Sequence, residues 1–190
     1  MAGILFAGGA GAEVFLSRQE ALKQAFPHAD EIRKRTVLLD DAQVAAIQSL
    51  ARAPLDSRIV TLYTGIRQHR VLGYALVDIH TVRTQPEAFL VVLTPEGKVR
   101  SLFMLAFYEP PEYRPPRRWL RQFDARGLSR DLRIGGTIHG IAGATLSSRA
   151  VTGTVRRSLA LFQVLVEPGL HQKTRRSKAS AGPAQPAGGM

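Results

Sequence analysis

Four segments rich in leucine, β-branched and aromatic residues occupy the middle of the chain, at 59–63, 70–79, 88–94 and 98–107. Turns separate them, and the Pro-Glu-Gly sequence at 95–97 is typical of a tight hairpin between antiparallel strands. No helical pattern lies between these strands. The spacing therefore predicts an antiparallel meander and argues against a doubly wound nucleotide-binding fold.

Two helices and a strand are predicted before this meander. Ser17 and Glu20 form a capping-box pattern for a first helix, which ends at Pro27. Residues 32–39 are expected to form a strand. Asp40 begins a second helix, closed by Pro54, whose apolar face is expected to consist of Val44, Ile47 and Leu50.

The second half of the chain predicts a loop followed by a long helix. Four prolines within residues 109–118 indicate a stiff, irregular loop, and 117–126 form a short amphipathic turn. After a glycine-punctuated stretch, apolar residues at helical spacing predict a helix over about 148–166. The fold class is therefore α+β: an antiparallel sheet meander with N-terminal helices and a C-terminal helix.

The length of 190 residues suits one domain with additional segments. We expect the domain over 57–168, preceded by a helical and strand segment at 13–56. Residues 1–12 are small and apolar and end in Ala-Gly-Ala, which indicates either the remnant of a signal peptide or a flexible terminus. Residues 169–190 have no apolar face and are expected to form a disordered basic tail.

Composition removes several classes of site. The chain has no cysteine, which excludes disulfides, thiolate zinc sites and iron–sulfur clusters, so redox chemistry would need an organic cofactor. The five histidines lack metal-ligand spacing, and the common catalytic signatures are missing, so no metal site is predicted. No window approaches the ~20 apolar residues of a membrane span.

The net charge of +11 is unevenly distributed. Residues 1–60 carry seven basic and seven acidic side chains, whereas 111–170 carry ten basic and four acidic, and 171–190 carry four basic and none acidic. A uniform basic coat would indicate a nucleic-acid partner. This distribution indicates a local anionic ligand and a basic tail instead.

The segment at 140–149, GIAGATLSSR, is the strongest candidate for a binding site. Gly143 and Ala144 present almost no side chain, so a bulky group can approach the backbone. Three hydroxyls follow near the expected helix start, where free N–H groups favour phosphate: Thr145, Ser147 and Ser148. Additional positive charge comes from Arg149, Arg156 and Arg157. The alternative is an ordinary helix N-cap, where serine and threonine are common.

Residues 142–148, AGATLSS, resemble the S-G-A-T-x-[ST]-S motif of FMN-binding domains. These domains occur in the FMN-carrying subunits of the sodium-pumping NADH:quinone reductase and the Rnf electron-transport complex, and in smaller relatives. Four other segments are similar to family motifs, in order, within roughly 59–165: VLGYAL at 71–76, LTPEGKV at 93–99, FYEP at 107–110 and WLRQF at 119–123.

The resemblance implies that a flavin transferase, with FAD as donor, esterifies the motif threonine to the FMN phosphate. The corresponding residue is Thr145, flanked by Gly143, Ala144 and Leu146, with Ser147 and Ser148 following. Two positions depart from the modified motif, which usually starts with Asp three residues before a Ser or Thr. Here His139 and Ala142 stand there, which leaves non-covalent FMN or a domain without flavin as alternatives.

Several supporting residues have two interpretations each. Glu109 and Tyr113 either approach the flavin or belong to a solvated loop. Trp119 and Phe123 either stack on the isoalloxazine ring or pack in the core. A cluster of arginines either lines the phosphate, docks an acidic partner or forms a solvated face: Arg114, Arg117, Arg118 and Arg121.

The resemblance implies an electron carrier on the extracytoplasmic, periplasmic side of a bacterial membrane, next to membrane redox complexes or cytochromes. The basic tail suits an anionic membrane surface. No general acid, general base or substrate pocket can be recognised in the sequence, which favours an electron carrier over an enzyme that converts a metabolite. A regulatory or assembly module of a reductase with a non-covalent or redox-sensing flavin is the alternative. A nucleic-acid partner is not expected, because the arginines are not interleaved with aromatic residues on a strand.

Overall fold

The computed structural model describes residues 13–82 and 85–168. A six-stranded antiparallel sheet runs in the order β1-β6-β5-β4-β3-β2. The α+β fold class predicted from the sequence is confirmed, and the central strands form the expected meander. The strands are β1 (Glu13–Val14), β2 (Glu31–Leu38), β3 (Ile59–Arg67), β4 (Arg70–Val82), β5 (Gln85–Leu93) and β6 (Val99–Phe107).

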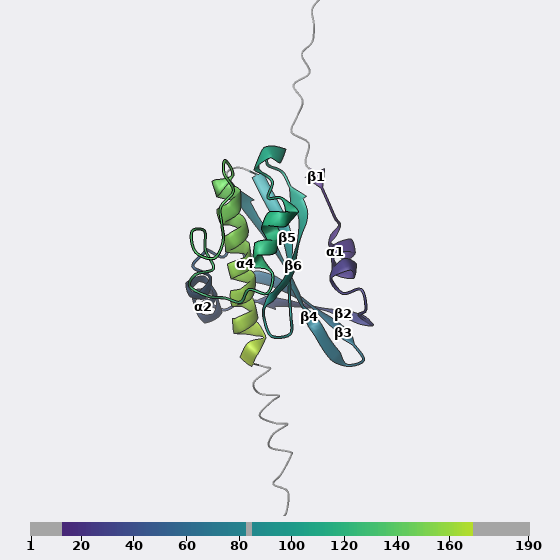
Figure 1. The fold of residues 1–190 in the computed structure, drawn as a ribbon. Helices are drawn as coiled ribbons and strands as arrows, with labels where there is room; N and C mark the ends of the chain where they lie inside the picture. Colours follow the sequence, from purple (N-terminus) through teal and green to yellow (C-terminus); the bar gives the residue numbers. More distant parts are fainter. Residues whose placement is uncertain (1–12, 83–84, 169–190) are drawn as a thin grey trace, which may run out of the picture.

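Helices cover both faces of the sheet (Figure 1). The long helix α4 (Thr145–Leu165) packs on β4 and β5 together with α2 (Asp41–Ala51), whereas α1 (Arg18–Ala25) lies on the opposite face. A short helical stretch follows β6 and consists of η1 (Pro111–Tyr113), α3 (Arg117–Leu120) and η2 (Arg121–Phe123).

Strand β5 is buried on both faces, which explains its nearly continuous run of apolar residues. Phe89, Val91 and Leu93 face the core under α4, and Leu90 and Val92 face the core under α1. Each of these side chains is fully buried. The sheet therefore separates two apolar layers, and the site described below lies at the end of the α4 layer.

The predicted helix starts are correct for the first two helices. Ser17 caps α1 in a capping box with Glu20, and Asp40 caps α2 in the same way with Gln43. The predicted apolar face of α2 is wrong at Leu50, whose exposed fraction is 40%. The buried residues of this helix are Ile47 and Ala51, so its apolar face continues at Ala51, four residues after Ile47, and Leu50 lies outside it.

The turn of the hairpin between β5 and β6 contains a glycine, Gly97, at a position where any side chain would be unfavourable. Gly97 has φ +75°, and a Cβ at this position would lie 2.3 Å from the ring of Phe162 on α4. The backbone N–H of Thr94 donates to the carbonyl of Lys98 at 2.7 Å. The turn therefore needs both the left-handed conformation and the small size of glycine.

The expected signal remnant at 1–12 and the expected basic tail at 169–190 lie outside the described residues. Within the part that the structure describes, none of the helices is long and apolar enough to cross a membrane.

Candidate functional site

Helix α4 begins at Thr145, three residues earlier than the sequence pattern indicates. Thr145 is exposed in the first turn, and the N-cap residue Ala144 provides no side-chain hydrogen bond. Gly143 has φ +79°, with no heavy atom within 4 Å of the place where a Cβ would be. The backbone just before Thr145 is therefore open at Gly143, next to the exposed first turn of the helix.

The three hydroxyls of the 142–148 segment have three different roles. Ser148 is fully buried; its Oγ accepts from the Ile141 N–H at 3.0 Å and donates to the Ala144 carbonyl at 2.9 Å. The Ser148 hydroxyl thus joins the backbone of the loop before α4 to the first turn of the helix, and it does not point toward a ligand outside the helix. Ser147 is buried beside a cleft, and only Thr145 presents its hydroxyl to solvent.

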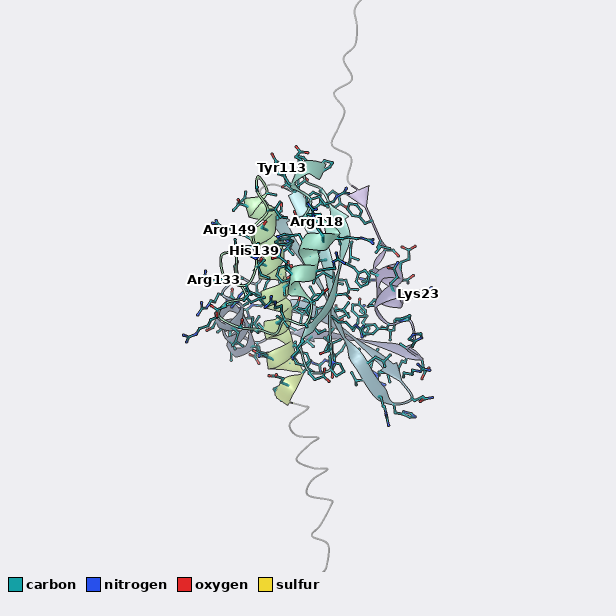
Figure 2. The ribbon with its side chains drawn as sticks, viewed as in Figure 1. Lys23, Tyr113, Arg118, Arg133, His139 and Arg149 are labelled. Carbon is teal, nitrogen blue, oxygen red and sulfur yellow. The ribbon has the colours of Figure 1, made fainter. Side chains whose placement is uncertain are left out.

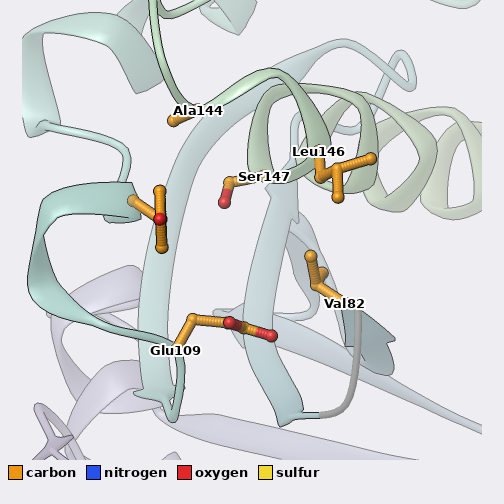
Figure 3. Close-up of a pocket in the computed structure, with 6 residues that line it drawn as sticks. Val82, Glu109, Ala144, Leu146 and Ser147 are labelled. Atoms are coloured by element: carbon orange, nitrogen blue, oxygen red, sulfur yellow. The ribbon is translucent and has the colours of Figure 1, made fainter.

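A small cleft joins the start of α4 to the loop after β6 (Figure 3). Its cavity volume of about 10 Å³ is room for about one water molecule. Glu109 contributes a carboxylate whose Oε1 is buried without a hydrogen-bond partner among the described residues, and the residue is only 8% exposed. The cleft, called the Glu109 cleft below, is lined by Val82, Glu109, Tyr113, Ala144, Leu146 and Ser147.

The loop that leads into α4 is held by the short helical stretch after β6. The Trp119 indole Nε1 donates to the carbonyl oxygen of His139 at 2.6 Å. The Gln122 side-chain oxygen accepts from the His139 N–H at 2.9 Å. The backbone at position 139 is therefore fixed on both sides, although the residue itself is exposed, as is Ala142.

The two interpretations of Trp119 and Phe123 are now distinguished. Both side chains are buried, and their rings form an edge-to-face pair with centroids 5.5 Å apart. They belong to the core cluster under α4 and are not available for stacking on a ligand. Their contribution to the site is to support the loop at His139.

The arginines divide between the surface and the interior. Arg117, Arg118 and Arg121 are exposed, and Arg149 is exposed in the first turns of α4. Figure 2 shows Arg118, His139 and Arg149 toward the end of the molecule at which α4 begins. Two exposed arginines, Arg118 and Arg149, thus lie toward the end of the molecule at which α4 begins.

Arg156 and Arg157 do not add charge to the α4 start, contrary to the sequence-based expectation. Arg156 is buried and donates to four backbone carbonyls, those of Leu50, Ala51, Ser129 and Leu132. Arg157 is buried in an ion pair with Asp78. Both lie farther along the helix, where their side chains turn toward α2 and the sheet.

Arg114 lies against a second, larger groove on the other side of the proline-rich loop. Its guanidinium lies over the ring of Phe15, 5.1 Å from the ring centroid. The groove has a cavity volume of about 630 Å³ and lies between this loop, β6 and the chain around α1. Its other walls include Leu16, Phe103, Met104 and Leu120.

A buried ionic cluster under α4 was not anticipated from the sequence. It consists of Asp78 and His80 on β4, Glu87 on β5, and Thr154 and Arg157 on α4. The Arg157 Nε and Nη2 each lie 2.7 Å from an Asp78 oxygen, and His80 Nδ1 lies 2.9 Å from Asp78 Oδ1. The Thr154 hydroxyl donates to Asp78 at 2.9 Å, and His80 Nε2 lies 3.5 Å from the Glu87 carboxylate.

The cluster shifts the protonation equilibria of its members. Burial alone would raise the pKa of Asp78, but hydrogen bonds from Arg157 and His80 and their charges hold it well below its usual range. Burial also disfavours the charged form of His80. The contacts with Asp78 and Glu87 outweigh burial and raise the pKa of His80 to about 9. The imidazole is therefore protonated at neutral pH.

One sequence signal for this cluster existed. Asp78 and His80 are two residues apart on a strand, which places both side chains on one face, and Thr154 and Arg157 are three apart on a helix. The pairing of His80 with Glu87 across β4 and β5 brings the fourth ionisable group to them. Among the described residues there is no group of side chains suited to hold a metal ion.

The chain matches no family model, and no curated protein matches it.

Proposed function

We propose that the chain is an FMN-binding electron-transfer protein, with the flavin linked through a phosphoester to Thr145. One observation carries the proposal: the Glu109 cleft unites two segments that resemble motifs of the FMN-binding family. Glu109 comes from the FYEP segment, and Ala144, Leu146 and Ser147 come from the AGATLSS segment. These segments lie more than thirty residues apart in the chain.

A third segment supports the same arrangement. Trp119 and Gln122, both from the WLRQF segment, hold the backbone of His139 just before the proposed attachment loop. Three segments that resemble family motifs therefore lie near one another in the fold, around the start of α4. Contacts of this kind are expected when the segments serve one site.

The start of α4 suits a phosphoester chemically. Thr145 is exposed, its neighbours are small, and the first-turn N–H groups with the positive end of the helix dipole stabilise a phosphate. In the attachment reaction the Thr145 oxygen forms a bond to the phosphorus of the FMN half of FAD. The bond to AMP breaks, AMP leaves, and the flavin transferase takes up the threonine proton.

The flavin supplies the one- and two-electron chemistry when bound, and the protein supplies attachment and exposure to partners. We propose a membrane redox complex or a cytochrome as partner, on the extracytoplasmic side. The exposed arginines 117, 118 and 121 suit an acidic partner surface, and the basic tail suits an anionic membrane.

The test is co-expression with a flavin transferase, followed by intact mass measurement and a denaturing gel viewed under ultraviolet light. We expect the wild type to gain FMN through a phosphoester and to fluoresce on the gel. Thr145→Ala should lose both signals, and Ser129→Ala, which removes an exposed hydroxyl outside the 142–148 segment, should keep them. A wild type that stays colourless, with the mass of the bare polypeptide, would overturn the proposal.

A second candidate function is a regulatory or assembly module with a non-covalent or redox-sensing flavin. It is favoured by His139 and Ala142, which replace the Asp and the Ser or Thr of the modified motif. This candidate predicts FMN that is released on denaturation, and reduced flavin that is not rapidly reoxidised by a quinone or a cytochrome.

A further inference from the structure

The Glu109 carboxylate is buried in the cleft with an unpartnered oxygen. The residue is 8% exposed, and its Oε1 has no hydrogen-bond partner among the described residues. Figure 3 shows the side chain extending from the loop into the space below Ser147. A buried acceptor without a donor costs free energy, so its retention indicates a ligand group that supplies one.

The cleft selects the kind of group that fits. A carboxylate repels a phosphate, so the occupant beside Glu109 is a hydrogen-bond donor and not the phosphate. The cavity holds about one water-sized oxygen, which excludes a flavin ring. The surrounding side chains of Val82 and Leu146 are apolar, which strengthens a hydrogen bond made there. A single hydroxyl group meets all three conditions.

The position of Thr145 indicates which part of the flavin arrives. Thr145 is not among the lining residues, and it is exposed, so a phosphate attached to it lies outside the cleft. Ser147, which does line the cleft, is only two residues farther along the same first turn. The atoms that follow the phosphate in FMN form the ribityl chain, which carries hydroxyl groups.

We propose that Glu109 binds a ribityl hydroxyl of the flavin, with the Ser147 hydroxyl beside it, and so fixes the direction in which the cofactor leaves Thr145. The inference rests on the proposed function. It assigns Glu109 to the ribityl chain, neither to the phosphate nor to the ring. Glu109 is thus a residue that binds and orients the cofactor.

The experiment uses apoprotein produced without a flavin transferase, titrated by flavin fluorescence with two probes. Riboflavin carries the ribityl chain without phosphate, and lumiflavin carries the ring without the ribityl chain. The variants are Glu109→Gln, Glu109→Met and the matched control Glu112→Gln, which removes an exposed carboxylate from the same loop.

We expect Glu109→Met to weaken riboflavin binding about tenfold, as for the loss of a charge-assisted hydrogen bond. Glu109→Gln should have a smaller effect, because an amide oxygen still accepts. Lumiflavin binding should be unchanged in every variant, and Glu112→Gln should match the wild type. The Tm of the Glu109→Met apoprotein should equal or exceed that of the wild type, since an unpaired buried carboxylate is removed.

Three results would overturn the inference. Riboflavin affinity unaffected by Glu109→Met would mean that the cleft holds only water. Equal weakening of both probes, or a lower Tm, would mean that Glu109 merely supports the fold. If the wild type did not bind riboflavin, the cleft would have no affinity for the ribityl chain. Intact mass after treatment with the transferase tests the Thr145 phosphoester independently, so the two proposals fail separately.

Discussion

Arg157 and Asp78 form a bidentate ion pair beneath α4, with two N–O distances of 2.7 Å. Their side chains are 7% and 12% exposed. The pair connects the helix that carries the proposed attachment residue to strand β4 in the centre of the sheet. Helix α4 is therefore fixed by a buried charge as well as by apolar packing.

Replacing Asp78 by Asn should strongly destabilise the protein. The substitution leaves the buried Arg157 without the carboxylate that pairs with it and leaves His80 with Glu87 alone, which costs about 3–5 kcal/mol. The free energy of unfolding, measured by urea denaturation, should fall by that amount. Asp41→Asn is the control: it breaks the exposed Asp41–Arg58 pair and should cost less than about 1 kcal/mol. Equal effects of the two substitutions would contradict the assigned role of the buried pair.

His80 should make the stability depend on pH above neutrality. Its pKa is raised to about 9 in the folded protein, against about 6.5 when unfolded, so the folded state holds its proton more tightly. The stabilisation is complete below about pH 6.5 and is lost as the pH rises to about 9. When the free energy of unfolding is measured by denaturation across this pH range, His80→Gln should make its decline with rising pH less steep. His69→Gln, which changes an exposed histidine, should leave it unaltered.

Asp78 produces the opposite dependence in acid. Because its folded pKa lies below the unfolded value of about 3.9, its contribution is present above that pH and is lost as the pH falls further. The unfolding free energy should therefore decrease on acidification below about pH 4, and Asp78→Asn should reduce the size of that decrease. If the unfolding free energy of this variant decreased below pH 4 as much as that of the wild type, other carboxylates would be responsible for the decrease.

Substitutions that remove the hydrogen bonds to the His139 backbone should slow flavin attachment and lower the stability only slightly. Trp119→Phe keeps an aromatic ring in the core but removes the donor to the His139 carbonyl, at a cost of about 1 kcal/mol. Gln122→Met removes the acceptor for the His139 N–H. Attachment rates followed by intact mass should fall in both variants and remain unchanged in Arg130→Gln, which changes an exposed arginine without an assigned role in the site.

Gly97→Ala should destabilise the protein by about 2–4 kcal/mol. The added Cβ would overlap the Phe162 ring, and the left-handed backbone is unfavourable for alanine. Gly127→Ala is the matched control, because no heavy atom lies within 4 Å of its Cβ position. Thermal unfolding should show a lower Tm for the first variant and a nearly unchanged Tm for the second.

The sequence alone determined the elements whose signals are local. The helix starts at Ser17 and Asp40 follow from capping boxes formed within three residues, and the hairpin at Gly97 follows from turn chemistry. The apolar, β-branched and aromatic segments separated by turns then predicted the meander, because antiparallel strands joined by short turns pair with their neighbours. The segment around Thr145 was likewise recognisable from small and hydroxyl-bearing residues in a short stretch.

Only the tertiary structure decided which of these residues meet. Arg156 and Arg157 are close in sequence to the proposed attachment segment, yet their side chains are buried, because α4 turns them toward α2 and the sheet. Glu87 reaches His80 through strand pairing, and Glu109 reaches Ser147 through the path of the loop after β6. Such contacts depend on how segments distant in the sequence pack against one another. The spacing of residues along the chain does not predict them.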